Sequence, residues 1–354
     1  MAKKVRFGVI GTGGISRYHM GGWQRSKRGT LVAACDIQPD HLTGFCEQFG
    51  LPPEKAYTDV RKMLRTEQPD CVSICTWAQH HCQLATLAAK AGVKGILLEK
   101  PLGYSMRDAD KLVRTAEKAG TKVLVMHQRR YSTRFTKARK LIAKGAIGQV
   151  HTLVRRAGGG LGNTHSHSID MMRYVLGDPK TEWVMAQVAR DTNRWERCYP
   201  CEDCVVGVIG FDGGVRGIID SDTPLEKGQG GLWIYGTEGA IDLFGGPSIM
   251  SKTTGGAWKP IEAKEVNPPV CYVRDLVKWI DGGPEPRISL RQAYETHHII
   301  MAMYESARTH RLVQLPLRNR GYILQQMIDD GLLPLKKKKG YDIRQEAAFK
   351  AGLR

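Results

Sequence analysis

The sequence lacks any long apolar run, and no stretch approaches the roughly 20 apolar residues that a helix needs to cross a bilayer. It also lacks the pattern of a secretory signal, because residues 1–6 are basic but no long apolar segment or small-residue cleavage site follows. Its nine cysteines are odd in number, which is typical of reduced thiols rather than of a disulfide framework. We therefore expect a cytoplasmic protein with no membrane contact.

The chain has little acidic charge for its size, with 35 Asp and Glu against 53 Lys and Arg and a formal net charge of +18. Such a charge is compatible with nucleic acid, an acidic membrane or a phosphorylated ligand. The basic residues are spread along the chain, however, apart from the run 336–339, and no basic stripe is interleaved with aromatic residues. We therefore expect no nucleic-acid partner, whereas a phosphosugar ligand or an acidic partner stays open.

The first 125 residues alternate between short apolar runs and longer amphipathic stretches. This alternation predicts a parallel sheet whose strands are buried on both faces and joined by crossover helices, in the α/β class. The predicted strands are 5–10, 31–35, 71–76, 95–98 and 122–126, and the predicted helices are 15–25, 40–49, 80–91 and 106–119.

The pattern then changes to strand-like segments separated by Gly, Pro and Asp turns. Such runs of strands predict an α+β domain with a largely antiparallel open sheet. The predicted strands are 150–157, 182–190, 204–211, 215–222, 231–235, 240–243 and 312–317, and the predicted helices are 131–144, 168–176, 272–280 and 290–310. Residues 318–354, with a weak helix at 322–332, are interpreted as a C-terminal extension that is either loose or packed on a neighbouring subunit.

A glycine-rich turn joins the first predicted strand to the first predicted helix. Gly11 would allow the tight turn, and Gly13 would let the backbone approach a pyrophosphate at the helix N-terminus. The third position of the pattern is Ser16, which is small enough for close packing of helix and strand. Asp36 follows the second strand about 25 residues after Gly11, the spacing of a ribose-binding acid. Because no Arg stands beside Asp36, the sequence favours NAD over NADP in a Rossmann domain over residues 1–125.

Glu99-Lys100-Pro101, at the end of the predicted strand 95–98, resembles the signature of the glucose–fructose oxidoreductase, inositol dehydrogenase and rhizopine-catabolism family (Gfo/Idh/MocA). Residues 71–81 resemble the family's fourth strand and the His-bearing helix after it, and residues 127–131 resemble the segment that enters its second domain. His167-Ser-Ile-Asp170 is similar to the His-x-x-Asp of its catalytic helix.

This resemblance covers about residues 4–317. It implies a substrate-binding and oligomerisation domain of α+β type over residues 126–317. It also implies an NAD-dependent enzyme that oxidises a secondary hydroxyl of a sugar, cyclitol or glycoside, with C3 of a glycoside as one candidate position. It also implies a homodimer or homotetramer formed through the open sheet, since an uncovered apolar sheet face is a liability.

The resemblance further implies two sets of binding residues, with Trp77 standing where the family usually has Pro. The cofactor set is Gly11, Gly13, Gly14, Ile15, Asp36, Thr76, Trp77, His81, Glu99 and Lys100. The substrate set is Lys100, Gln128, Arg130, Tyr131, Asn163 and His167.

The predicted catalytic residues are Lys100, His167, Asn163 and His165. A Lys at the carboxyl end of a parallel strand points into the ligand crevice, where Lys100 would bind the reacting hydroxyl. His167 suits a general base because an unperturbed His titrates near pH 6.5. Asn163 stands where the family usually has Asp and cannot take a proton. His165 would compensate if the segment is extended, so either His is a candidate base, and we prefer His167 with Asn163 positioning the substrate.

Two features leave alternatives open. Cys198, Cys201 and Cys204 resemble a metal motif, but lone thiols often serve as small buried hydrophobes, so we predict no metal. An NAD-dependent glycosidase that acts by transient oxidation and elimination would carry the same motifs, and so would a catalytically silent NAD-binding regulator. The sequence alone does not separate these functions from a dehydrogenase.

Overall fold

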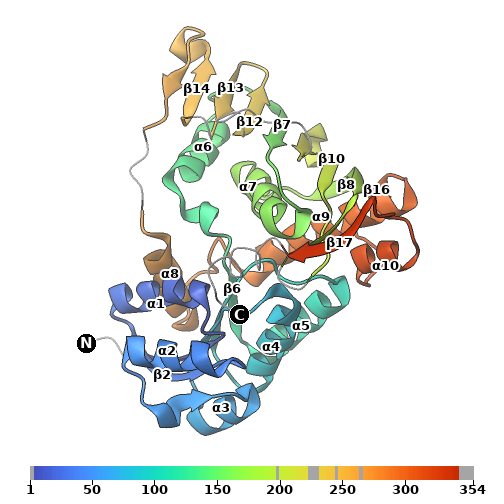
Figure 1. Cartoon of the computed structure of the whole chain (residues 1–354). Coiled ribbons are helices and arrows are strands. Elements are labelled where there is room, and N and C mark those ends of the chain that lie inside the picture. The colour runs from blue at the N-terminus through green and yellow to red at the C-terminus, as the bar shows by residue number, and fades with distance from the viewer. Residues whose placement is uncertain (1–3, 197–198, 222–230, 244–245, 263–265, 343–354) are drawn as a thin grey trace. The chain divides into compact units, whose positions relative to one another are not determined.

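The computed structural model describes residues 4–196, 199–221, 231–243, 246–262 and 266–342 (Figure 1). The chain forms two compact units. The first consists of Met1–Gly103, Arg107–Tyr131 and Val266–Tyr294, and the second consists of Tyr104–Met106, Ser132–Glu265 and Glu295–Arg354. Within the described ranges, no helix is both long and apolar enough to span a membrane.

The first unit is built on a six-stranded sheet in the part of the chain that the structure describes. The strand order is β3-β2-β1-β4-β5-β6, and every neighbouring pair runs parallel. The strands are β1 (Val5–Ile10), β2 (Gly29–Cys35), β3 (Ala56–Tyr57), β4 (Cys71–Ile74), β5 (Gly95–Leu98) and β6 (Lys122–Val125). This confirms the predicted doubly wound α/β architecture; the two-residue β3 is too short to leave a sequence pattern.

Helices cover both faces of this sheet. They are α1 (Gly14–Ser26), α2 (Pro39–Phe49), α3 (Val60–Glu67), α4 (Ala78–Lys90), α5 (Met106–Ala119) and α8 (Pro268–Ile280). Side chains alternate along a strand, so Val9 of β1 enters one apolar cluster with Trp23 and Leu276, while Ile10 enters the other with Ala85 and Leu112. The continuous apolar strands are therefore explained by burial on both faces.

Helix α8 comes late in the chain but packs on the first unit, where Tyr272 and Leu276 join the cluster around Trp23. The resemblance implies one domain over residues 126–317. In the structure, residues 266–294 instead belong to the first unit, because the apolar side of α8 completes that core. The expected boundary at residue 125 stays a prediction.

The second unit contains a nine-stranded sheet within the described ranges, in the order β15-β14-β13-β12-β7-β11-β10-β8-β16. Its pairs are antiparallel except β7–β11. The strands are β7 (Val150–Arg156), β8 (Thr181–Ala189), β10 (Cys204–Phe211), β11 (Arg216–Asp220), β12 (Gly231–Gly236), β13 (Gly239–Asp242), β14 (Ser248–Ser251), β15 (Lys259–Pro260) and β16 (Val313–Gln314). The predicted, largely antiparallel sheet is confirmed.

Helices α6 (Thr133–Ala143), α7 (Ser166–Val175) and α9 (Leu290–Thr309) accompany this sheet. Met172 of α7 and Met303 of α9 approach strand glycines 217 and 207, so these helices cover one face. On the strands, Met185, Val206 and Tyr235 are exposed apolar side chains. The sheet therefore carries exposed apolar groups, as expected for an open sheet.

The C-terminal segment packs on its own unit. Strand β17 (Lys337–Asp342) pairs in parallel with β9 (Thr192–Trp195), and α10 (Ile323–Asp329) precedes it (Figure 1). The sequence predicts a C-terminal extension that is either loose or packed on a neighbouring subunit. This expectation is wrong for residues 318–342, because backbone pairing of β17 with β9 holds them on the second unit. Residues 343–354 lie outside the described ranges.

Candidate active site

The carboxyl ends of the first unit's parallel strands form one edge of the sheet. The strand order reverses between β1 and β4, and ligands of doubly wound sheets bind outside the carboxyl ends at such a point. Gly11, Asp36, Thr76 and Glu99 follow β1, β2, β4 and β5 respectively. The structure therefore brings the predicted cofactor residues to the same edge.

The glycines of the β1–α1 turn differ in their surroundings. Gly11 has φ 87°, and a Cβ there would lie 2.8 Å from the carbonyl carbon of Cys75 and 2.8 Å from the amide nitrogen of Thr76. A Cβ at Gly13 or Gly14 would meet no atom within 4 Å. Gly11 is therefore required by the fold itself, whereas Gly13 and Gly14 border open space.

That open space lies in front of the N-terminus of α1. Gly13 caps the helix without a side-chain hydrogen bond, and the first turn contains no acidic residue. Unsatisfied N–H groups and the helix dipole attract anions at such an end. The turn therefore fits a pyrophosphate.

Asp36 is held by the same turn. Its Oδ2 accepts hydrogen bonds from the Thr12 amide at 2.6 Å and from the Thr12 hydroxyl at 3.0 Å, and its Oδ1 accepts from the Gln38 amide at 2.9 Å. These bonds fix the carboxylate at the end of β2, where an acid binds ribose hydroxyls. Sequence reasoning missed Thr12, although its place between Gly11 and Gly13 was a usable signal.

Three large apolar side chains around this edge are exposed: Ile15 by 42%, Ile37 by 79% and Trp77 by 41%. Exposed aromatic and aliphatic groups beside an anion-binding turn suit the flat rings of a dinucleotide. The open turn supplies hydrogen-bond donors, Asp36 supplies an acceptor, and these three side chains supply apolar surface. This combination fits NAD.

Glu99 forms a buried pair below Lys100. The His19 Nε2 lies 3.1 Å from Glu99 Oε1, and the Lys100 amide donates to Glu99 Oε2 at 3.2 Å. Burial opposes the charged imidazole, but Cys75 and the bonded Glu99 carboxylate outweigh it and raise the pKa of His19 to about 10. Burial likewise opposes the charged carboxylate, but His19 and Lys100 lower the pKa of Glu99. The pair is therefore ionic and anchors the strand end that carries Lys100.

His81 connects two loops of this edge. Its Nδ1 lies 2.6 Å from the Pro101 carbonyl and its Nε2 lies 3.0 Å from the Thr76 carbonyl. His81 thereby supports the loop after β4 and the loop that contains Lys100.

Two predicted substrate residues have structural contacts inside the first unit. Arg130 is buried and donates to the Arg287 carbonyl at 3.2 Å. The Tyr131 hydroxyl donates to Asp275 Oδ2 at 2.6 Å, and burial followed by the Asp275 charge raises its pKa. Gln128 opens the short helical turn Gln128–Tyr131 and is half-buried. Contact of Gln128, Arg130 and Tyr131 with substrate stays a prediction.

The second unit carries Asn163, His165 and His167 on one segment. Leu161–His165 is a π-helical turn that leads directly into α7. The conditional expectation of an extended segment is therefore wrong, and His165 and His167, about 200° apart around a helix, do not face the same side. The buried Glu202 explains the turn, because its carboxylate accepts hydrogen bonds from the Leu161 amide and from the Tyr304 hydroxyl.

The two histidines also differ in burial. His165 is fully buried, and burial followed by the Arg155 charge lowers its pKa to about 4. A group with so low a pKa is a weak base at neutral pH. His167 is only half-buried. Within this unit, His167 is thus the better candidate for the base.

Asn163 is paired with a residue that sequence reasoning missed. Its Nδ2 donates to Glu196 Oε1 at 2.5 Å, and Glu196 is buried directly after β9. The only sequence signal was an acidic residue next to Trp195, in a segment without a clear pattern.

The cysteine motif cannot be followed in full, because Cys198 lies outside the described residues. Burial raises the pKa of the Cys201 thiol to about 12. Among the residues that the structure describes, no group of three or more His, Cys, Asp or Glu side chains is arranged to hold a metal ion.

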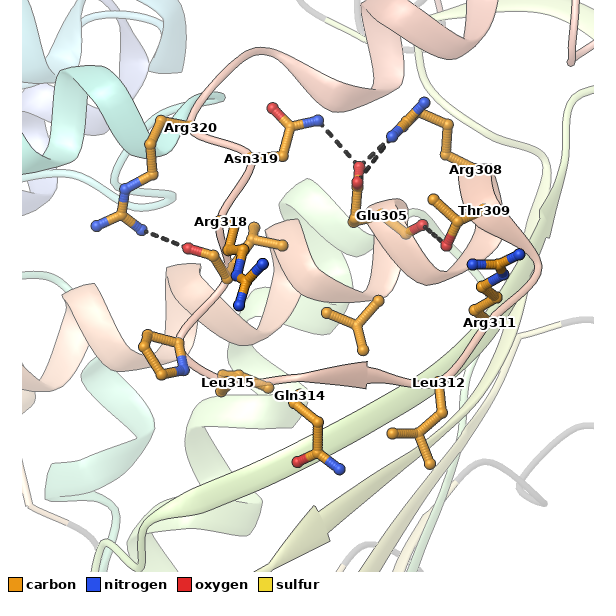
Figure 2. Close-up of a pocket in the computed structure, with 13 residues that line it drawn as sticks. Glu305, Arg308, Thr309, Arg311, Leu312, Gln314, Leu315, Arg318, Asn319 and Arg320 are labelled. Atoms are coloured by element: carbon orange, nitrogen blue, oxygen red, sulfur yellow. Dashed lines mark hydrogen bonds and ion pairs between the residues drawn. The ribbon is translucent and has the colours of Figure 1, made fainter.

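A pocket of about 1060 Å³ lies between the end of α9 and residues 311–320 (Figure 2). Glu305 pairs there with Arg308 at 2.8 Å and accepts from Asn319 at 3.0 Å, while Arg311 and Arg318 lie well apart in the view. None of the predicted site residues lines this pocket, so we place the candidate active site elsewhere.

Comparison with known proteins agrees with this site. Residues 5–127 match the family model described as "Oxidoreductase family, NAD-binding Rossmann fold", and residues 151–242 match "GFO/IDH/MocA C-terminal domain". Together the two matches span more than half of the chain.

Relatives that match over most of their length are also oxidoreductases by name. The chain is 26% identical to a D-apiose dehydrogenase of Paraburkholderia graminis, over 88% of this chain and 90% of that protein. It is 23% identical to a D-glucoside 3-dehydrogenase of Escherichia coli, over 88% and 97%. The crystal structure of the WlbA dehydrogenase from Bordetella pertussis, in complex with NADH and UDP-GlcNAcA, has the same fold, with a TM-score of 0.74, 24% identity and coverage of 89% and 100%. The chain therefore belongs to the Gfo/Idh/MocA family and is an NAD-binding oxidoreductase.

Proposed function

We propose that this protein is a cytoplasmic dehydrogenase that oxidises a secondary hydroxyl of a sugar, cyclitol or glycoside, with C3 of a glycoside as the first position to test. The observation that carries the proposal is the open anion site at Gly13 and Gly14, which shares a sheet edge with Asp36 and Lys100. Relatives whose names are D-apiose dehydrogenase and D-glucoside 3-dehydrogenase support the substrate class.

In this reaction NAD⁺, when bound, supplies the hydride acceptor. The Lys100 ammonium would donate a hydrogen bond to the reacting hydroxyl and stabilise negative charge as it develops on that oxygen. His167 would take the hydroxyl proton and pass it to solvent, and Asn163 would hold a neighbouring hydroxyl. The half-buried His167 suits this role better than the fully buried His165.

We also propose a homodimer or homotetramer. The exposed Met185, Val206 and Tyr235 on the strands of the second unit support it, because association would remove this apolar surface from water. Sedimentation of the purified protein tests this directly, and a monomer at micromolar concentration would contradict it.

The test of activity is NADH formation at 340 nm with NAD⁺ and a panel of free sugars, cyclitols, nucleotide sugars and aryl glycosides, with release of the aryl group followed in parallel. We expect NADH with one substrate class, loss of that signal in Lys100→Ala, and retention in Lys111→Ala, which removes an exposed lysine of α5. Aryl release without NADH would instead identify a glycosidase, and silence in both channels despite NADH binding would identify a regulator. The dehydrogenase names of the relatives do not favour either alternative.

A further inference from the structure

The side-chain amide of Asn163 donates a hydrogen bond to a fixed acceptor. Its amide nitrogen lies 2.5 Å from Glu196 Oε1. An ionised carboxylate only accepts hydrogen bonds, so it selects the NH₂ end of the Asn163 amide and turns the carbonyl end elsewhere. Glu196 therefore favours this orientation of the Asn163 amide on the π-helical turn.

The strand that precedes Glu196 is paired with the C-terminal segment. It follows β9, whose partner strand is β17. The Lys336 and Lys337 amides donate to the Asp191 carbonyl at 2.8 and 2.9 Å, and Asn193 Nδ2 donates to the Lys338 carbonyl at 3.2 Å. Without β17, β9 would lose its described strand partner.

A stack of tyrosines supports the same region. The Glu196 amide donates to the Tyr199 carbonyl at 2.7 Å, and the Tyr199 ring stacks between Tyr104 and Tyr322. Tyr322 precedes α10 in the C-terminal segment, and Tyr104 stands four residues after Lys100 in the sequence. Contacts from residues 322–342 thus reach β9, which precedes Glu196 in the sequence, and Tyr199, which follows it.

We propose that Glu196 is a substrate-positioning residue, which sets the polar atom that Asn163 presents to a sugar hydroxyl, and that β17 keeps Glu196 in place. The proposal rests on the proposed function and deepens it. Asn163 carries an amide, and Glu196 supplies a carboxylate beside the segment that carries His167. The C-terminal segment thereby contributes to substrate recognition.

The pair permits an exchange test. Glu196→Gln keeps the shape but no longer dictates the amide orientation, because Gln both donates and accepts. Asn163→Asp places two carboxylates 2.5 Å apart, where both cannot stay ionised. The double variant N163D/E196Q restores one amide and one carboxylate with their positions exchanged. A purely structural role for Glu196 predicts instead that the single variants lose NADH affinity along with kcat/KM.

The experiment measures kcat and KM for the panel substrate that the wild type oxidises, together with the Kd of NADH. We expect E196Q and N163D each to lower kcat/KM about tenfold, the effect of one hydrogen bond to a charged group. We expect the double variant to recover most of that loss and the Kd of NADH to stay within about twofold. Glu182→Gln, which removes an exposed carboxylate on β8, is the matched control and should match wild type.

A wild-type kcat/KM in E196Q would overturn the positioning role of Glu196 and leave the proposed function intact. A double variant no better than the single variants would have the same consequence. If the wild type and E182Q oxidise no panel member, the proposed function fails and this inference fails with it. The double variant keeps the test decisive if a single variant folds poorly, since it re-forms the donor and acceptor pair.

Discussion

The His19 imidazole and the Glu99 carboxylate lie 3.1 Å apart, buried between α1 and the end of β5. Removing one partner of a buried ion pair leaves the other charge uncompensated, which typically costs about 3–5 kcal/mol. We therefore expect His19→Ala to lower the free energy of unfolding in urea by about that amount. His41→Ala, at an exposed position of α2, is the control and should change it by less than about 0.5 kcal/mol.

The same pair predicts a pH dependence. The pKa of His19 is raised from 6.5 to about 10, so its contribution is fully present below pH 6.5 and is lost as the pH rises towards 10. The pKa of Glu99 is lowered from 4.5, so its contribution is lost as the pH falls below 4.5. The gap in unfolding free energy between wild type and His19→Ala should therefore shrink steadily from pH 6.5 to 10. A gap that is constant over this range would contradict the assigned protonation.

The two glycines of the β1–α1 turn should respond differently to alanine. Gly11→Ala forces a methyl group to within 2.8 Å of the backbone of Cys75 and Thr76 at φ 87°, so we expect a loss of stability of several kcal/mol. Gly13→Ala meets no protein atom within 4 Å. It should keep the melting temperature within a few degrees but raise the Kd of NADH at least about tenfold, because the methyl group occupies the pyrophosphate's approach. Equal NADH affinity in Gly13→Ala would argue against this cofactor position.

Asp36 should control the choice between NAD and NADP. Its carboxylate is fixed by Thr12 and would repel a 2′-phosphate. We expect Asp36→Ala to weaken NADH binding about tenfold and to reduce the preference for NADH over NADPH. Fluorescence titration with both nucleotides measures this ratio, and an unchanged preference would show that another residue discriminates.

Deletion of residues 336–354 should separate substrate binding from cofactor binding. The deletion removes β17, so β9 loses its partner while the cofactor edge of the first unit keeps its contacts. We expect a higher KM for the substrate and an unchanged Kd of NADH. A deleted protein with the KM of the wild type would show that β17 does not contribute to substrate binding.

Local patterns predicted most of the architecture, because buried strands and amphipathic helices leave periodic signals. The long-range contacts left none. Nothing in residues 272–280 indicates that α8 packs beside Trp23, and nothing in residues 337–342 indicates pairing with β9. At the candidate site, the glycine pattern and Asp36 were readable because their spacing is regular. The π-helical turn at Leu161–His165 and the Glu196 partner were not, since both depend on the buried Glu202 and on the fold of the C-terminal segment.

The most direct test of the central claim is the fate of the hydrogen on the oxidised carbon. The panel substrate is prepared with deuterium at that carbon, and the NADH formed with NAD⁺ is analysed by mass spectrometry. The account predicts NADH that carries the deuterium, a slower reaction than with the unlabelled substrate, and no product in Lys100→Ala. Deuterium released to water, or product formed without labelled NADH, would contradict oxidation by direct hydride transfer.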